Sequence, residues 1–177
     1  MRGRIALVAG IIVLLLVNWS ILGKERLLSE GKIVYLHLAP VDPRSLRQGD
    51  YMALRFAIEN DLYKALPKVE QKRYRGWRRN LENSDGRVVV KLDDKGIATF
   101  NRLEDGQPLA NDEIYMRYRV RDGALKFATN AYFFQEGHAQ DYITAQYGQF
   151  RVDKNGELLL TAMYDKDLKK LGPPGQK

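Results

Sequence analysis

The chain has 177 residues, no cysteine and a formal net charge of +7. This length is enough for one domain with a core of its own, and the absence of cysteine excludes disulfides and thiolate chemistry. The positive charge is concentrated in residues 64–79, which contain seven basic residues and one acidic residue.

Residues 5–22 form an uncharged apolar run near the N-terminus. As an α-helix the run would be about 27 Å long, at about 1.5 Å per residue, which is close to the ~30 Å hydrocarbon core of a bilayer. Trp19 lies near its far end, where aromatic rings favour the membrane interface. We therefore expect a transmembrane anchor at residues 5–22.

A cleaved signal peptide is the competing interpretation of this run. The apolar region of a signal peptide is usually shorter, and it ends in a small-x-small cleavage site that Ser20-Ile21-Leu22 does not supply. Arg2 and Arg4 precede the run, which favours a cytoplasmic N-terminus and a domain outside the cytoplasm.

The chain after the anchor divides into three further parts. Residues 23–31 are expected to be a connector that begins as a helix, residues 32–171 a single β-rich extracytoplasmic domain, and residues 172–177 a disordered tail. Alternation of side chains in residues 32–39 predicts a first strand with both faces partly covered.

A turn-rich segment with two prolines, residues 40–47, leads to Gly49 and Asp50. Gly49 is suited to a positive φ, and Asp50 to holding the turn through its side chain. The residues that follow alternate, which predicts a half-buried strand that pairs with residues 32–39 in a hairpin-like arrangement. Its buried face is expected to comprise Met52, Leu54, Phe56 and Ile58.

A short helix is expected next, capped by Asn60 or Asp61 and ended by Pro67. Its inward-facing side chains are expected to be Leu62, Tyr63 and Leu66. Residues 68–85 carry many charges and little periodicity, so we expect them to form a long loop.

Alternating apolar residues continue through the second half of the chain. The clearest run is residues 114–121, and the Asp122-Gly123 pair after it is a strong hairpin signal. A short helix is expected at residues 138–146, with Ala139, Tyr142 and Ile143 facing inward. Further strands are expected at residues 87–92, 97–103, 124–129, 131–134, 149–152 and 157–163. About eight strands and two short helices predict an antiparallel β-sandwich or partly open barrel after one N-terminal transmembrane helix.

The segment Gly49-Asp50-Tyr51-x-x-Leu54-x-Phe56 resembles the motif of the GDYxxLxY family of uncharacterised membrane-anchored proteins. The usual lead-in of the family is matched by Asp42, Pro43 and Arg44. Three later segments resemble the C-terminal half of the family: Phe134-x-Glu136-Gly137, Ala145-x-Tyr147-Gly148 and Val152-Asp153. Phe56 is a departure, because the motif has tyrosine there.

The resemblance implies a protein of the bacterial inner membrane whose domain faces the periplasm or the outside. A membrane setting of this kind also points to a multi-pass membrane protein as a partner. The resemblance implies no activity and no cofactor.

The sequence gives little support for a metal site or an activated nucleophile. His37 and His138 are far apart, without further ligands at the spacing that zinc requires, so no metal is expected. No serine is placed with a base and an orienting group.

One segment is similar to signal peptidases, which are also anchored β-proteins. They carry a Pro-x-Leu-x-x-Gly-Asp pattern before a core strand, and Pro43, Leu46, Gly49 and Asp50 occur here in a similar order. Val41 occupies the position of the catalytic serine, so this similarity concerns the fold at most.

The basic segment 64–79 contains Tyr74 and Trp77 between its charges. This composition suits an anionic membrane surface or a nucleic acid, and a domain outside the cytoplasm meets lipid headgroups first. A solvated loop is the alternative. The expected contacts with lipid or anions are Lys72, Arg73, Arg75, Trp77, Arg78 and Arg79.

Two functional hypotheses follow from the sequence. The first is a single-pass, non-enzymatic accessory or interaction domain that contacts lipid through its anchor and partners an integral membrane protein. The second is an anchored hydrolase with a carboxylate pair for acid–base work, on a fold distantly similar to signal peptidase. The candidate carboxylates for the second are Asp42, Asp50, Glu136 and Asp141.

Overall fold

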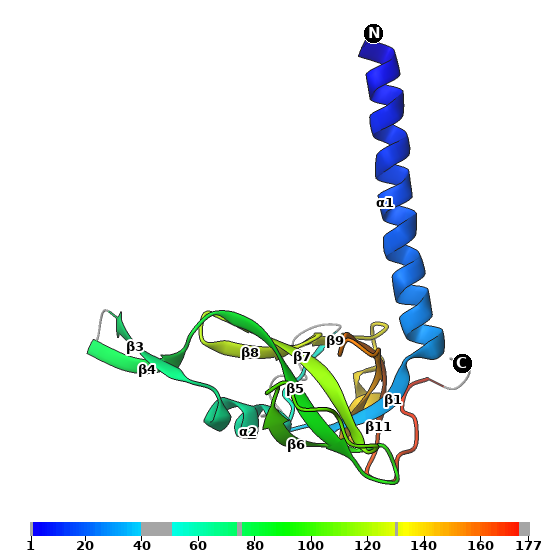
Figure 1. The fold of residues 1–177 in the computed structure, drawn as a ribbon. Helices are drawn as coiled ribbons and strands as arrows, with labels where there is room; N and C mark the ends of the chain where they lie inside the picture. Colours follow the sequence, from blue (N-terminus) through cyan, green and yellow to red (C-terminus); the bar gives the residue numbers. More distant parts are fainter. Residues whose placement is uncertain (1, 40–50, 74–75, 130, 174–177) are drawn as a thin grey trace.

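The computed structural model describes residues 2–39, 51–73, 76–129 and 131–173. In these residues a long N-terminal helix stands on a domain with eleven strands and one short α-helix (Figure 1). The antiparallel sheets include a half-barrel, which confirms the predicted mainly β fold after an N-terminal apolar helix. The tail predicted to be disordered lies mostly outside the described residues.

The helix α1 (Arg2–Glu30) includes the apolar run and also most of the expected connector. The large apolar side chains described along the run are all exposed. By length and composition, Leu7–Glu30 is able to cross a membrane, and none of its apolar window is buried. The helix therefore keeps its apolar surface available to lipid.

The end of α1 is packed against the domain. Leu27 is buried, and the guanidinium of Arg151 on β10 (Tyr147–Val152) donates a 2.9 Å hydrogen bond to the carbonyl of Gly31. A Cβ at Gly31 would lie 2.3 Å from the carbonyl oxygen of Leu27, so a larger residue does not fit this turn. The chain enters β1 (Lys32–His37) at once, and helix and domain are joined without a loose linker.

One sheet has the order β1-β10-β11, where β11 is Leu158–Tyr164. β10 and β11 form the last predicted hairpin. The predicted pairing of residues 32–39 with residues 51–58 is wrong except for one bridge between Leu38 and Phe56. β10 pairs with β1 along its whole length, so this edge is already occupied.

The second sheet has the order β6-β5-β7-β8. The hairpin turn predicted at Asp122-Gly123 is confirmed, because both residues have positive φ, 54° and 73°, as a type I′ turn requires. The bounds are β5 (Ser84–Leu92), β6 (Ala98–Leu103), β7 (Glu113–Arg121) and β8 (Ala124–Phe127).

β5 begins at Ser84, inside the segment that was expected to be a loop. Ser84 and Gly86 pair with Val120 and Tyr118 of β7. A Cβ at Gly86 would lie 2.5 Å from the hydroxyl oxygen of Tyr118. The glycine therefore marks a close approach of a ring to the strand and not a turn.

The strand expected over residues 51–58 is shorter than predicted. β2 (Tyr51–Ala53) pairs with β9 (Ala131–Phe133), and α2 (Ile58–Ala65) starts two residues before the expected cap, Asn60. The N–H of Phe56 donates a 3.2 Å hydrogen bond to the carboxylate of Glu59, which stabilises the turn into the helix.

The long loop predicted at residues 68–85 is wrong. Its first part forms a hairpin of β3 (Lys68–Arg73) and β4 (Gly76–Leu81), which projects from the side of the domain (Figure 1). Backbone pairing alone does not require apolar alternation, so these charge-rich strands lack the usual strand signal in the sequence.

The core confirms most of the predicted inward positions. Met52, Leu54, Phe56 and Ile58 are all buried, although only the first belongs to a strand. The predicted inward positions of Tyr63 and Ile143 are wrong, because both side chains are exposed. α2 buries Ile58 and Leu62, and residues 138–146 form only the 3-10 turn η2 (Ala139–Tyr142), which buries Tyr142 alone.

Candidate functional site

The pairing of β2 with β9 brings two distant parts of the chain together. Tyr51, from the Gly-Asp-Tyr segment, lies opposite Phe133, which directly precedes Phe134-x-Glu136-Gly137. The sheet therefore brings the first of these segments next to the start of the second. Figure 1 shows β9 at the upper side of the domain, the side from which α1 leaves.

The outer face of this sheet carries an exposed aromatic pair, Tyr51 and Phe133. Their ring centroids are 5.8 Å apart, with an angle of 41° between the ring planes. Tyr51 is 45% exposed and Phe133 is 74% exposed. No large apolar side chain described after α1 is more exposed than Phe133, so this pair is the candidate contact surface.

The inner face of the sheet is anchored by further rings. Tyr142 is buried, 5.3 Å between centroids from Tyr132 and 5.1 Å from Phe134. Burial and a hydrogen bond with Tyr142 raise the pKa of Tyr132 to about 12, so its phenol stays neutral at ordinary pH. These contacts hold the β2–β9 sheet in place.

The end of the motif has a packing role. Leu54 and Phe56 are buried, and the ring of Phe56 lies 5.4 Å from that of Phe150 in an edge-to-face contact. A Cβ at Gly148 would lie 3.3 Å from the Phe56 ring and 3.1 Å from Leu160. Glycine at 148 thus leaves room for Phe56, and the expectation that Leu54 and Phe56 belong to the core is confirmed.

The turn after β9 presents polar groups to solvent. Glu136 is exposed, and Gly137 has a φ of +84°, which favours glycine. Nδ1 of His138 lies 2.7 Å from a carboxylate oxygen of Asp141, so this pair closes the next turn locally.

The predicted motif and carboxylate residues before Tyr51 lie outside the described residues. The hypothesis of a carboxylate pair therefore stays a prediction. The residues concerned are Asp42, Pro43, Arg44, Gly49 and Asp50.

The basic residues expected to contact lipid fall on the β3–β4 hairpin. The structure describes the backbone of Lys72, Arg73, Trp77, Arg78 and Arg79 but not their side chains, and Arg75 lies outside the described residues. The lipid prediction is therefore untested. Of the flanking lysines, Lys64 is paired with Asp61 at 3.3 Å, and Lys68 lies 4.9 Å above the ring of Tyr63.

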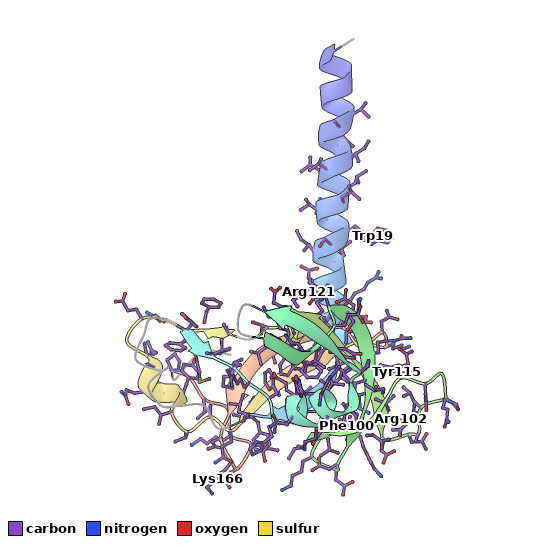
Figure 2. The ribbon with its side chains drawn as sticks, turned by 90° about the vertical axis from the view of Figure 1, so that its left-hand side faces the viewer. Trp19, Phe100, Arg102, Tyr115, Arg121 and Lys166 are labelled. Carbon is purple, nitrogen blue, oxygen red and sulfur yellow. The ribbon has the colours of Figure 1, made fainter. Side chains whose placement is uncertain are left out.

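The outer face of β7 carries arginines that are paired with acids. Arg117 forms an ion pair with Glu157, and Arg121 binds both oxygens of Asp85 at 2.9 and 2.8 Å. The hydrogen bond from Arg121 lowers the pKa of the Asp85 carboxyl. Figure 2 shows Arg121 on the upper side of the domain.

A cleft of ≈ 800 Å³ lies in the angle between α1 and the domain. Arg26 and Glu30 of the helix form one wall, and Tyr115 and Lys154 of the domain contribute to the other. Its lining mixes both charges with apolar side chains. Among the described residues, no group of three or more acidic or histidine side chains is arranged to hold a metal ion.

The comparison with protein families gives one match. The model described as GDYXXLXY protein matches residues 13–163. The chain belongs to this family. Searches of curated proteins and of solved structures give no match.

The GDYXXLXY match begins inside α1 and ends inside β11, so it includes most of α1 and nearly all of the domain. This extent confirms the resemblance found in the motif. Together with the exposed apolar helix, it fits a membrane-anchored protein.

Phe133 was missed as a site residue by sequence reasoning. Tyr132, Phe133 and Phe134 are three consecutive aromatic residues in an extended segment. Successive side chains of a strand point to opposite faces, so such a run must place at least one ring outward. This signal was present in the sequence.

Proposed function

We propose that this GDYXXLXY protein is a single-pass protein of the bacterial inner membrane and a non-enzymatic accessory to an integral membrane protein. Its β domain lies on the periplasmic or outer side, because Arg2 and Arg4 favour a cytoplasmic N-terminus. α1 remains uncleaved in this proposal and provides both the anchor and part of the contact with the partner.

Asn18 is the observation that carries this proposal. It lies in α1 about 6 Å before the end of the apolar run, counted at about 1.5 Å per residue. Its Nδ2 donates a 2.9 Å hydrogen bond to the Leu14 carbonyl of the same helix. Its side-chain oxygen has no partner among the residues that the structure describes.

A polar amide on a lipid-exposed helix favours contact with another helix. Hydrogen bonds between membrane helices contribute about 1–2 kcal/mol in model peptides and about 0.6 kcal/mol on average in a folded protein. Leu14 lies one turn before Asn18 and Ile11 two turns before it, so the three share one stripe. A partner helix on this stripe would satisfy Asn18 without moving the domain.

Site-specific photo-crosslinking in native membranes tests the proposal. A crosslinking residue at Leu14 should capture a multi-pass membrane protein, and the same residue at Leu16, on the opposite face, should capture mainly lipid. Asn18→Leu should reduce the capture from Leu14 and should leave the abundance of the protein unchanged.

Two results would refute the accessory role, and a third would refute the anchor. One is equal capture from Leu14 and Leu16, which shows that the stripe has no specific neighbour. The other is a protein that purifies alone from mild detergent and turns over a substrate. Cleavage of α1 in cells would exclude the anchor itself.

A further inference from the structure

The exposed aromatic pair Tyr51–Phe133 has no role in the core. Both rings lie on the outer face of the β2–β9 sheet, whereas the inner face packs through Met52 and Tyr132. A contiguous exposed apolar patch is a common mark of a contact surface. The question is which surface this pair meets.

The anchor fixes the distance between the domain and the membrane. If the hydrocarbon core ends at Leu22, then Leu27 lies about 7.5 Å further along the helix axis, within the ~5–8 Å headgroup layer. Leu27 is already buried against the domain, and Gly31 follows without a linker. The side of the domain from which α1 leaves is therefore held against the headgroups.

The β2–β9 sheet lies on that same side. Figure 1 shows β9 at the upper side of the domain, whereas α2 lies lower, on the side away from α1. In Figure 2, Lys166 marks the lower end of the domain, and Trp19 lies on the helix above it. Because the inner face of the β2–β9 sheet packs into the core, its outer face points away from the core.

We propose that the aromatic pair Tyr51–Phe133 is a second membrane contact, which inserts into the headgroup region of the bilayer that α1 crosses. The inference rests on the uncleaved anchor of the proposed function and on the position of β9 relative to α1. Phe133 supplies an apolar ring for the boundary of the acyl chains, and the hydroxyl of Tyr51 remains among the headgroups.

Lipid fits this pair better than a protein partner does. A stable protein interface buries about 1,200–2,000 Å² in total, which is more than two neighbouring rings provide. A contact on a protein that is already anchored needs far less surface, because the anchor keeps the rings at a high effective concentration next to the bilayer.

Fluorescence quenching in the full-length protein, reconstituted in vesicles, tests this contact. Three variants each keep one tryptophan: native Trp19 with Trp77→Phe, Phe133→Trp with both native tryptophans changed to Phe, and Tyr63→Trp in the same background. Tyr63 lies on α2 and is the matched control, because it is an exposed aromatic residue on the lower side of the domain.

Lipids brominated near the glycerol end of their acyl chains should quench native Trp19 and the reporter introduced by Phe133→Trp. They should leave the reporter introduced by Tyr63→Trp unchanged, and aqueous iodide should quench that reporter instead. Tyr51→Trp provides a second reporter of the same surface if Phe133→Trp does not fold.

The outcomes separate this inference from the proposed function. If Trp19 is quenched by bromine and the Phe133→Trp reporter is quenched only by iodide, the second contact is refuted and the anchor stands. Protection of that reporter from both quenchers indicates a protein contact and also refutes the lipid proposal. If Trp19 itself escapes bromine, the anchor fails and the inference fails with it.

Discussion

Phe56 and Phe133 allow one comparison in which the same substitution should give opposite results. Phe56 is 1% exposed and packs on Phe150, whereas Phe133 is 74% exposed. A buried Phe→Ala change costs about 3–5 kcal/mol, because it removes transfer energy and leaves a cavity. Surface changes stay within about 0.5 kcal/mol.

The expected shift in melting temperature follows from the size of the chain. At about 2–4 °C per kcal/mol for a protein of this length, Phe56→Ala should lower the melting temperature by roughly 6–20 °C. Phe133→Ala should lower it by about 2 °C or less. Thermal unfolding of both full-length variants, followed by circular dichroism in the same detergent, measures the two values.

Equal losses in the two variants would refute the reasoning. A large loss in Phe133→Ala would show that this ring belongs to the packing of the domain, which would also remove the basis for a membrane contact. A small loss in Phe56→Ala would show that the Gly-Asp-Tyr segment does not pack on Phe150 as described.

Three further predictions concern the anchor, one buried acid and the basic hairpin. Deletion of residues 1–23 should leave a soluble folded domain, since Leu27 and Gly31 are retained; aggregation without detergent would contradict this. Burial raises the pKa of Glu59 above that of a free glutamate. The stability that the protonated Glu59 carboxyl contributes is therefore present below the pKa of a free glutamate and is lost as the pH rises through the folded pKa. Glu59→Gln should therefore melt at or above wild type at neutral pH and lose that advantage near pH 4, and melting curves with a constant difference at both pH values would refute the assignment. The soluble domain should bind anionic vesicles and not neutral ones, with each basic residue near the surface contributing about 1 kcal/mol at low salt. Substitution of glutamine for the four arginines Arg73, Arg75, Arg78 and Arg79 should abolish this binding without changing the melting temperature. Equal binding by the wild type and this variant would show that the hairpin is only a solvated surface.

The parts of the fold that were predicted correctly have strong local signals. The strict alternation of residues 114–121 and the Asp122-Gly123 pair fix β7, its turn and its buried face within one short segment. The partner of β1 was not predictable in this way. Its pairing with β10 joins opposite ends of the domain, and alternation identifies a strand without identifying its neighbour.

The hairpin β3–β4 and the candidate surface were missed for different reasons. β3 and β4 are rich in charged residues, so the hydrophobic pattern that marks a strand is absent. For Tyr51 and Phe133, the outward direction of each ring follows from strand alternation, but their contact depends on the non-local β2–β9 pairing. The Gly-Asp-Tyr motif identified the family. Its last two positions, Leu54 and Phe56, were correctly predicted to belong to the core.

α1 continues without a break into the domain, so the number of residues in the helix sets how the domain is rotated about the helix axis. An α-helix turns by about 100° and rises by about 1.5 Å per residue. One extra residue at Gly23 would therefore swing the whole domain around the axis of the span and raise it from the bilayer, with Asn18 left in place. The stripe that contains Asn18 and the face that contains Phe133 thus have a fixed angular relation, and the length of the helix between Asn18 and Leu27 sets it.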